Sequence, residues 1–214
     1  MTLELLKRIT DSLVDGDPDA TVEGTRLALD AGLAPLTIIS DGLVPGMEVV
    51  GDRFQTGEYF LPHLIIAASG MQQAMELLEP ELKQRHEVVQ RLGTVVIGTV
   101  QGDIHEIGKT LVATLLSAAG FQVYDLGVNV SAAEFVSKVR ETNAGLLGLS
   151  ALLTTTMTAQ RQVIDALREA GIRDRVKVMV GGAPVSQEWT ETIGADGYAE
   201  DAVGAVALAK NLVS

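Results

Sequence analysis

Apolar residues recur at helical spacing through the first ninety positions, and no strand pattern interrupts them. Asp17 is placed to cap the second helix, Pro18 suits its first turn, and Pro45-Gly46 should break or kink the third. Four helices without strands predict an antiparallel four-helix bundle, the cap domain, over residues 1–88. The spacing places the helices at residues 3–14, 18–31, 35–43 and 62–85. In the last helix the positions expected to face inward are Leu64, Ile65, Ala68, Met71, Ala74, Met75 and Leu78.

After a short polar linker at residues 86–92, brief apolar runs alternate with helical segments. Strict alternation of this kind predicts a parallel sheet with helices on both faces, and at this size the flavodoxin-like strand order 2-1-3-4-5. The fold class is therefore α plus α/β, with a five-stranded Rossmann-type domain over residues 93–214. The strands are expected at residues 94–100, 121–126, 144–149, 176–180 and 197–199.

Composition narrows the class of protein. Apolar residues make up 47% of the 214 positions and aromatic residues 4%, so the cores should be aliphatic and alanine-rich. The absence of cysteine excludes disulfides, thiolate metal sites and a cysteine nucleophile. A net charge of −12 argues against nucleic-acid binding and against adhesion to anionic membranes. With no apolar run long enough to span a membrane and no signal-peptide pattern in Met1–Asp19, we expect a cytoplasmic protein.

Candidate chemistry gathers in the loop between the first predicted strand of the second domain and the helix after it. The loop reads Gly102-Asp103-Ile104-His105-Glu106-Ile107-Gly108, and open α/β sheets bind ligands at such loops. It is not a P-loop, because five residues separate its glycines where a P-loop has four. His105 preceded by Asp103 suggests an imidazole oriented by a carboxylate. The alternative is a histidine that caps the helix, with Asp103 as a turn residue.

Asp103, His105 and Gly108 resemble the DxHxxG signature of cobalamin-binding domains. The resemblance implies that His105 is the lower axial ligand of the corrinoid cobalt and displaces the cofactor's own base, the base-off/His-on form. It also implies that Asp103 accepts the hydrogen bond of the other ring nitrogen, which fixes the tautomer. His105 is the one predicted metal ligand.

Two further segments resemble later signatures of the same domains. Ser150-Ala151-Leu152 resembles the Ser-x-Leu motif, whose serine bonds the nucleotide tail of the cofactor, and Thr154 adds a nearby hydroxyl. Thr156 matches the residue that bonds the aspartate; the match is often serine, so threonine is a mild departure. The alternative for these hydroxyls is ordinary helix capping.

The third signature is Gly181-Gly182, at the end of the fourth predicted strand, where side chains would block the nucleotide tail. Gly98 and Gly148 also lie near strand ends. Glycines within strands mark close approach of a ligand or of another backbone. The four glycines together predict a deep, narrow slot.

Phe60-Leu61-Pro62 resembles the helical cap of methyl-carrying corrinoid proteins and of cobalamin-dependent methionine synthase, where this motif packs over the upper corrin face. The resemblance implies a methyltransferase-cognate corrinoid protein. Such a carrier shuttles a methyl group, by way of cobalt(I) and methylcobalt(III), between a substrate-specific methyltransferase and a second one that uses tetrahydrofolate or a thiol. A reductive activase is a further implied partner. The chain would be a carrier subunit with no catalytic residues of its own.

Three alternatives stay open. A cobalamin-binding mutase subunit would share the second domain but needs no methyl-protecting cap, so residues 1–90 weigh against it. A cobalamin-based sensor normally adds a basic DNA-binding module, and the acidic charge weighs against that. A cofactor-free flavodoxin-like signalling or scaffold protein would purify colourless and ignore added cobalamin.

Overall fold

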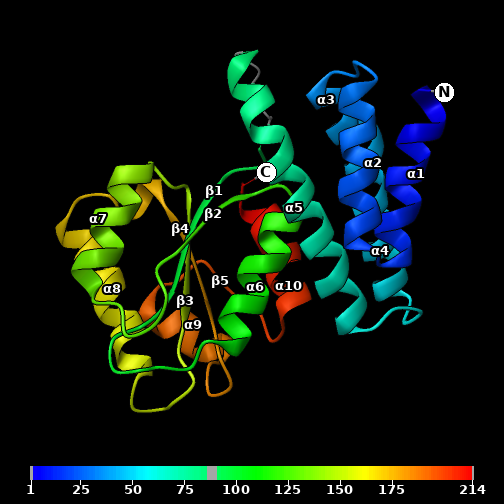
Figure 1. Ribbon diagram of the computed structural model, residues 1–214. Coiled ribbons are helices and arrows are strands. Elements are labelled where there is room, and N and C mark those ends of the chain that lie inside the picture. The colour runs from blue at the N-terminus through cyan, green and yellow to red at the C-terminus, as the bar shows by residue number, and fades with distance from the viewer. Residues whose placement is uncertain (1, 86–90, 214) are drawn as a thin grey trace. The chain divides into compact units, whose positions relative to one another are not determined.

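The structure is a computed structural model that describes residues 2–85 and 91–213 (Figure 1). It divides into two compact units, Met1–Gln90 and Arg91–Ser214, called here the helical unit and the α/β unit. Residues 86–90 of the predicted linker lie outside the described residues. None of the described helices combines the length and the apolar character that a membrane crossing requires.

The helical unit is built from helices alone in its described part. Asp17 caps the second helix as predicted, because its carboxylate accepts a hydrogen bond from the Ala20 amide at 2.9 Å. Aliphatic side chains from all the helices form one core, which includes Ile9, Leu13, Ile38, Leu43, Met71 and Leu78. The helices are α1 (Thr2–Asp15), α2 (Pro18–Asp30), α3 (Pro35–Ile38), α4 (Val44–Gln55) and α5 (Leu61–Gln84).

The predicted break at Pro45-Gly46 is wrong. A π-helical segment, Ile39–Leu43, joins α3 to α4, and the Val44 amide donates to the Ile39 carbonyl. Proline has no N–H for the carbonyl four residues earlier, and its ring clashes with that carbonyl in a regular helix. The wider turn just before Pro45 accommodates both effects, so the helix continues to Gln55 instead of ending at Leu43.

Ile65 in α5 is also misassigned by the sequence pattern. Leu64, Ala68 and Met71 face the core, whereas Ile65 is 43% exposed. Ile65 follows Leu64 by one residue, which turns its side chain about 100° around the helix and away from the bundle. The surface of α5 near its first turn therefore carries apolar side chains that the bundle itself does not bury.

The α/β unit contains a five-stranded parallel sheet in the order β2-β1-β3-β4-β5, which confirms the predicted topology. Helices α7 and α8 cover one face of the sheet, and α6 and α10 cover the other (Figure 1). The strands are β1 (Thr94–Thr99), β2 (Gln122–Asp125), β3 (Leu146–Ser150), β4 (Lys177–Gly181) and β5 (Gly197–Tyr198). The helices are α6 (Ile107–Ala118), α7 (Ala132–Thr142), α8 (Met157–Glu169), α9 (Gln187–Ile193) and α10 (Ala202–Val213), with a 3-10 turn at Arg173–Arg175.

Gly98 and Gly148 do not line a slot, contrary to prediction. A Cβ on Gly98 would come within 2.8 Å of the Phe135 ring, and one on Gly148 within 3.0 Å of the Ile97 side chain. Both glycines therefore make room for core side chains of the unit itself. Glycine in a strand marks close approach, but the approaching group here is protein.

The backbone conformation at position 182 and the closely packed neighbouring chain require a glycine there. Its φ is +123°, and a Cβ there would lie 1.8 Å from the Ala151 carbonyl oxygen. At Gly181 a Cβ would meet the Ala199 carbonyl oxygen at an ordinary 3.5 Å. The segments that follow β3 and β4 thus pass each other at backbone contact.

This difference predicts unequal effects of alanine at the two positions. Gly182→Ala should lower the free energy of unfolding by at least about 2 kcal/mol, through a strained φ and a steric clash. Gly181→Ala, the matched control, should change it by less than about 0.5 kcal/mol. Urea unfolding followed by the fluorescence of Trp189, the chain's single tryptophan, measures both. Equal losses would contradict the assignment of the clash to Gly182.

Candidate functional site

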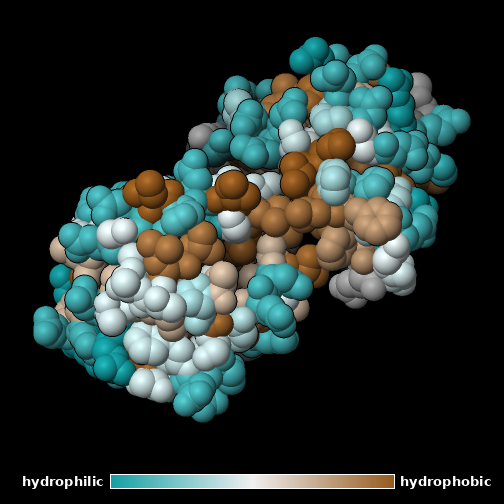
Figure 2. Space-filling model, turned by 90° about the horizontal axis from the view of Figure 1, so that it is seen from below, coloured by the Kyte–Doolittle hydropathy of each residue, from teal (hydrophilic) through white to brown (hydrophobic). Residues whose placement is uncertain are grey.

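The candidate site lies where the carboxyl ends of β1 and β3 meet. In register, Thr99 of β1 lies beside Ser150 of β3, which lies beside Gly181 of β4. In this strand order β1 connects to β2 on one side and β3 connects to β4 on the other, so the connections that follow β1 and β3 leave in opposite directions. Open α/β sheets bind ligands in the crevice at such a switch point. Figure 2 looks onto this edge of the sheet.

Asp103 joins the two loops that follow these strands. Its side chain is buried, with 1% of the residue exposed. One carboxylate oxygen, Oδ2, accepts hydrogen bonds from the Leu152 amide at 2.8 Å, the Leu153 amide at 3.3 Å and the Thr156 hydroxyl at 2.7 Å. The other, Oδ1, accepts from the His105 amide at 3.0 Å and lies 2.7 Å from His105 Nδ1.

These hydrogen bonds set the charge of Asp103. Burial by itself raises the pKa of the carboxyl group, but the bonds from Thr156, His105 and Leu152 outweigh burial and hold the pKa well below its ordinary range. Asp103 is therefore a carboxylate at neutral pH and can act as an acceptor only.

The ionised Asp103 fixes the state of the His105 ring. Because Oδ1 cannot donate, Nδ1 carries the proton in the 2.7 Å contact, and in the neutral ring Nε2 therefore has the lone pair. The His105 side chain is 47% exposed, and no hydrogen bond among the described residues engages Nε2. The helix-capping alternative is wrong, since Glu106 is the N-cap of α6 and makes no side-chain cap bond. Nε2 is thus oriented and available as a ligand.

Two residues that sequence analysis missed hold the loop backbone. Thr99 donates its hydroxyl to the His105 carbonyl at 2.8 Å. The side-chain oxygen of Asn129 accepts a hydrogen bond from the Gly102 backbone amide at 2.8 Å. The backbone amide of Asn129 donates to the Asp103 carbonyl at 2.9 Å. Asn129 has a φ of 55°, a conformation asparagine tolerates. An asparagine in a turn was the only signal that the sequence offered. The Gly102 amide that its side chain binds lies 27 residues earlier in the chain, so the contact could not be read from the sequence.

Lys109 is a further missed residue near the loop. The helix α6 begins at Ile107, so Gly108 and Lys109 belong to its first turn. Lys109 is buried and forms an ion pair with Asp125 at the end of β2, whose carboxylate also accepts from the Gly127 amide at 2.8 Å. The pair ties the start of α6 to the neighbouring strand.

The surroundings of His105 are apolar and open. Ile104, Ile107, Leu152 and Leu153 all expose their side chains, and Figure 2 shows apolar side chains at this surface of the α/β unit. A Cβ on Gly108 would meet no atom within 4 Å. One imidazole nitrogen within an apolar rim offers a metal a single ligand, so its other ligands must come from a bound organic group. This donor set fits a metal carried by a macrocycle.

The remaining predicted site residues are distributed as follows. Ser150 is half-buried at the end of β3, and Thr154 is exposed. Thr156 is the N-cap of α8 but makes no side-chain cap bond; its hydroxyl lies nearer to the Asp103 carboxylate than to the Leu153 carbonyl, at 2.7 and 2.9 Å. Phe60 belongs to the helical unit, where its side chain is exposed.

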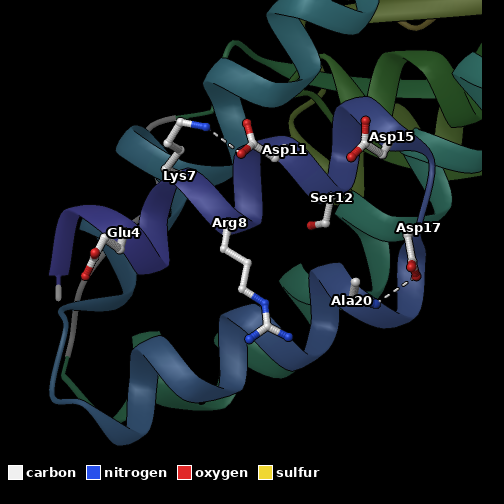
Figure 3. Close-up of a pocket in the computed structure, with 8 residues that line it drawn as sticks. All are labelled: Glu4, Lys7, Arg8, Asp11, Ser12, Asp15, Asp17 and Ala20. Carbon is white, nitrogen blue, oxygen red and sulfur yellow. Dashed lines mark hydrogen bonds and ion pairs between the residues drawn. The ribbon is translucent and has the colours of Figure 1, made fainter.

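A separate hollow of about 360 Å³ lies between α1 and α2 and is lined by the residues labelled in Figure 3. Both basic residues at this hollow have acidic partners: Lys7 lies 2.7 Å from Asp11, and Arg8 lies 3.1 Å from Glu23. Asp17, also at its edge, caps α2. These side chains bind one another and the helix end, so the candidate chemistry remains at the sheet edge.

Comparison with known families identifies the class of protein. Family models described as a B12 binding domain match residues 93–207 and, separately, residues 5–79. The chain belongs to the B12-binding corrinoid proteins. Its relatives include the trimethylamine corrinoid protein 1 of Methanosarcina acetivorans, 47% identical over 95% of this chain and 94% of the relative. The dimethylamine corrinoid protein 2 of the same organism is 48% identical over 98% of this chain and 96% of the relative.

Solved structures agree. The methanol:cobalamin methyltransferase complex MtaBC from Methanosarcina barkeri contains a chain that matches with a TM-score of 0.89 and 34% identity, over 98% of this chain and 80% of that one. A cobalamin-binding protein from Desulfitobacterium hafniense matches with a TM-score of 0.72 and 34% identity, over 98% of both chains. The predicted resemblance to methyltransferase-cognate corrinoid proteins is therefore confirmed.

Acid should remove the stabilisation that Asp103 provides. Because the pKa of Asp103 is lower in the folded than in the unfolded protein, its contribution is complete above about pH 4 and declines as the pH falls toward the folded-state pKa. The difference in free energy of unfolding between wild type and Asp103→Asn should be constant between about pH 7 and 5. Below about pH 4 it should shrink by up to about 1.4 kcal/mol per pH unit. Denaturant unfolding across this range measures the difference.

The variant Thr156→Val provides the matched comparison, because it removes one donor to Asp103 and keeps the side-chain volume. It should be about 1.5–3 kcal/mol less stable than wild type at neutral pH. An Asp103→Asn difference that stays level down to about pH 3 would contradict the charged state assigned to Asp103.

Proposed function

We propose that this corrinoid protein is the methyl carrier of a methyltransferase system and that His105 binds the cofactor's cobalt through Nε2, in the base-off/His-on form. The proposal rests chiefly on one observation: the Thr156–Asp103–His105 chain of hydrogen bonds, which ends in an exposed ring nitrogen at the switch point of the sheet. The corrinoid, when bound, supplies a cobalt ion that accepts and releases a methyl group.

The hydrogen-bonded chain gives His105 two usable states. With Nε2 unprotonated, the ionised Asp103 increases the basicity of the ring and favours metal binding. With Nε2 protonated, the carboxylate 2.7 Å from Nδ1 would stabilise the imidazolium, which would not bind a metal. Asp103 keeps its charge in both states because its second oxygen accepts from Leu152 and Thr156.

The carboxyl ends of β3 and β4 are proposed to line the site of the nucleotide tail. Ser150, Gly181 and Gly182 lie where these strands end, and no hydrogen bond among the described residues uses the Ser150 hydroxyl. That hydroxyl could bond the displaced base. Leu152 and Thr154 lie on the adjoining loop, with their side chains exposed.

The helical unit supplies the proposed lid. Phe60 is 65% exposed, and Leu61 and Ile65 in the first two turns of α5 are exposed as well. The Phe60 amide donates to Nδ1 of His63, 3.0 Å away, and Tyr59 stacks on the His63 ring, so the aromatic segment is well anchored. Apolar side chains held in this way could exclude water from the upper face of a reduced cofactor.

The names of the relatives support a methylated amine as methyl donor, since they are trimethylamine and dimethylamine corrinoid proteins. A substrate-specific methyltransferase would load the carrier, and a second methyltransferase would pass the methyl group to tetrahydrofolate or a thiol. A reductive activase would return oxidised cofactor to the active state. The chain is then a carrier subunit, with no substrate pocket assigned to it.

Replacing His105 by alanine tests the ligand assignment. The visible absorption bands of bound cob(III)alamin should shift, because cobalt loses its nitrogen ligand from the protein, and the dissociation constant should rise about tenfold or more. Glu106→Ala, a change at the exposed neighbouring residue, should leave the spectrum and affinity of wild type. An unchanged spectrum in the His105 variant would remove the ligand role.

Replacing Phe60 by alanine tests the lid. Dissolved oxygen should oxidise the bound, reduced cofactor at least about threefold faster, because an apolar cover is lost. Leu27→Ala, which removes an exposed apolar side chain from α2, should leave the rate unchanged. Absorbance at the bands of the reduced cofactor follows the reaction. Equal rates in wild type and the Phe60 variant would mean that other residues form the lid.

A further inference from the structure

Gln160 is a polar residue inside an apolar core. It lies on α8 with 0% exposure, between Ala159 and Val163, which belong to the hydrophobic core on the α7 and α8 face of the sheet. An amide buried in this way is costly unless its donors and acceptor are all satisfied. Its position therefore requires an explanation in terms of the groups that it bonds.

Its partners are the ends of two strands and the chain's single tryptophan. The Gln160 side-chain amide nitrogen donates to the Leu149 carbonyl at 3.0 Å and to the Gly181 carbonyl at 3.3 Å. Its carbonyl oxygen accepts from the Trp189 indole N–H at 2.9 Å. All the hydrogen-bonding capacity of the amide nitrogen is used, and the side chain connects β3, β4 and α9.

The two carbonyls lie at the point where β3 and β4 separate. Ser150 pairs with Gly181 at the end of the ladder, and Gly181 also accepts from the Ala151 amide at 3.1 Å. Immediately beyond, Gly182 passes the Ala151 carbonyl so closely that a Cβ would overlap it. A shift of a few tenths of an ångström between the strand ends would displace Ser150 and the Gly181-Gly182 segment relative to each other, since the backbones are closely packed.

We propose that Gln160, held by Trp189, is a positioning residue that holds Ser150 and the Gly181-Gly182 segment in place for the cofactor's nucleotide tail. This rests on the proposed function, which places the tail at the carboxyl ends of β3 and β4. Gln160 touches the strand ends from the core side and acts through them. It should therefore affect binding of the tail and leave the His105 side of the site unchanged.

The experiment compares two corrinoids in the full chain without cofactor. Hydroxocobalamin carries the nucleotide tail, and cobinamide has the same corrin ring and cobalt without it. The variant Gln160→Met keeps an unbranched side chain of similar length but removes the amide. Gln162→Met makes the same change at an exposed position of the same helix and is the control. Titration followed by visible absorption gives the dissociation constants.

Gln160→Met should raise the dissociation constant for hydroxocobalamin about tenfold, the effect of losing a well-made buried hydrogen bond. The constant for cobinamide should stay within about twofold of wild type, and Gln162→Met should match wild type for both. Trp189→Phe removes the indole N–H together with part of the ring, leaves the Gln160 amide in place, and should show the same selectivity with a smaller rise. It also decides the question if Gln160→Met does not fold, as judged by circular dichroism.

Three results would overturn the inference. Equal loss of both corrinoids would assign Gln160 a general structural role, and no loss of either would show that Ser150 and Gly181-Gly182 keep their positions without the amide. If Gln160→Met does not fold, the Trp189→Phe variant takes its place. A Trp189→Phe protein with the same preference between the two corrinoids as wild type would also overturn the inference. Wild type that binds neither corrinoid would instead overturn the proposed function, and this inference with it.

Discussion

A single buried anion organises the site. Asp103 sits at the carboxyl edge of the sheet with almost no exposure, and an unpaired carboxylate in that position would be strongly destabilising. Its charge is compensated by donors from its own loop and from the loop after β3. Because those donors must converge on one carboxylate, the two loops are brought together, and the orientation of His105 follows from the same contacts.

Other contacts fix the loop that carries this anion. Thr99 and Asn129 hold its backbone, while the buried pair of Lys109 and Asp125 ties the start of α6 to β2. The rim is different, because Ile104 and Ile107 expose apolar side chains that the α/β unit does not bury. A hydrogen-bonded polar base beneath an apolar rim suits a large, flat cofactor with a broad nonpolar surface.

The helical unit shows the same division between core and exposed apolar surface. Leu64, Ala68 and Met71 of α5 enter its aliphatic core, whereas Phe60, Leu61 and Ile65 expose their side chains near the start of that helix. Neighbouring aromatic and imidazole rings anchor this segment. Exposed apolar side chains on a well-ordered element commonly mark a binding surface, and here they lie in the motif that resembles a corrin-covering cap.

The sequence by itself determined the larger features: the helical and α/β units, the strand order, and the pairing of His105 with an aspartate two residues away. These follow from local periodicity and from short motifs, which are properties of adjacent residues. Tertiary structure decided the rest. Asn129 and Gln160 bind backbone groups that lie 27 and 21 residues away in the chain. Gly98 and Gly148 leave room for core side chains, whereas the sequence suggested room for a ligand. Local patterns mark the positions where something must approach closely; only the folded chain determines whether that something is a ligand, a side chain or another strand.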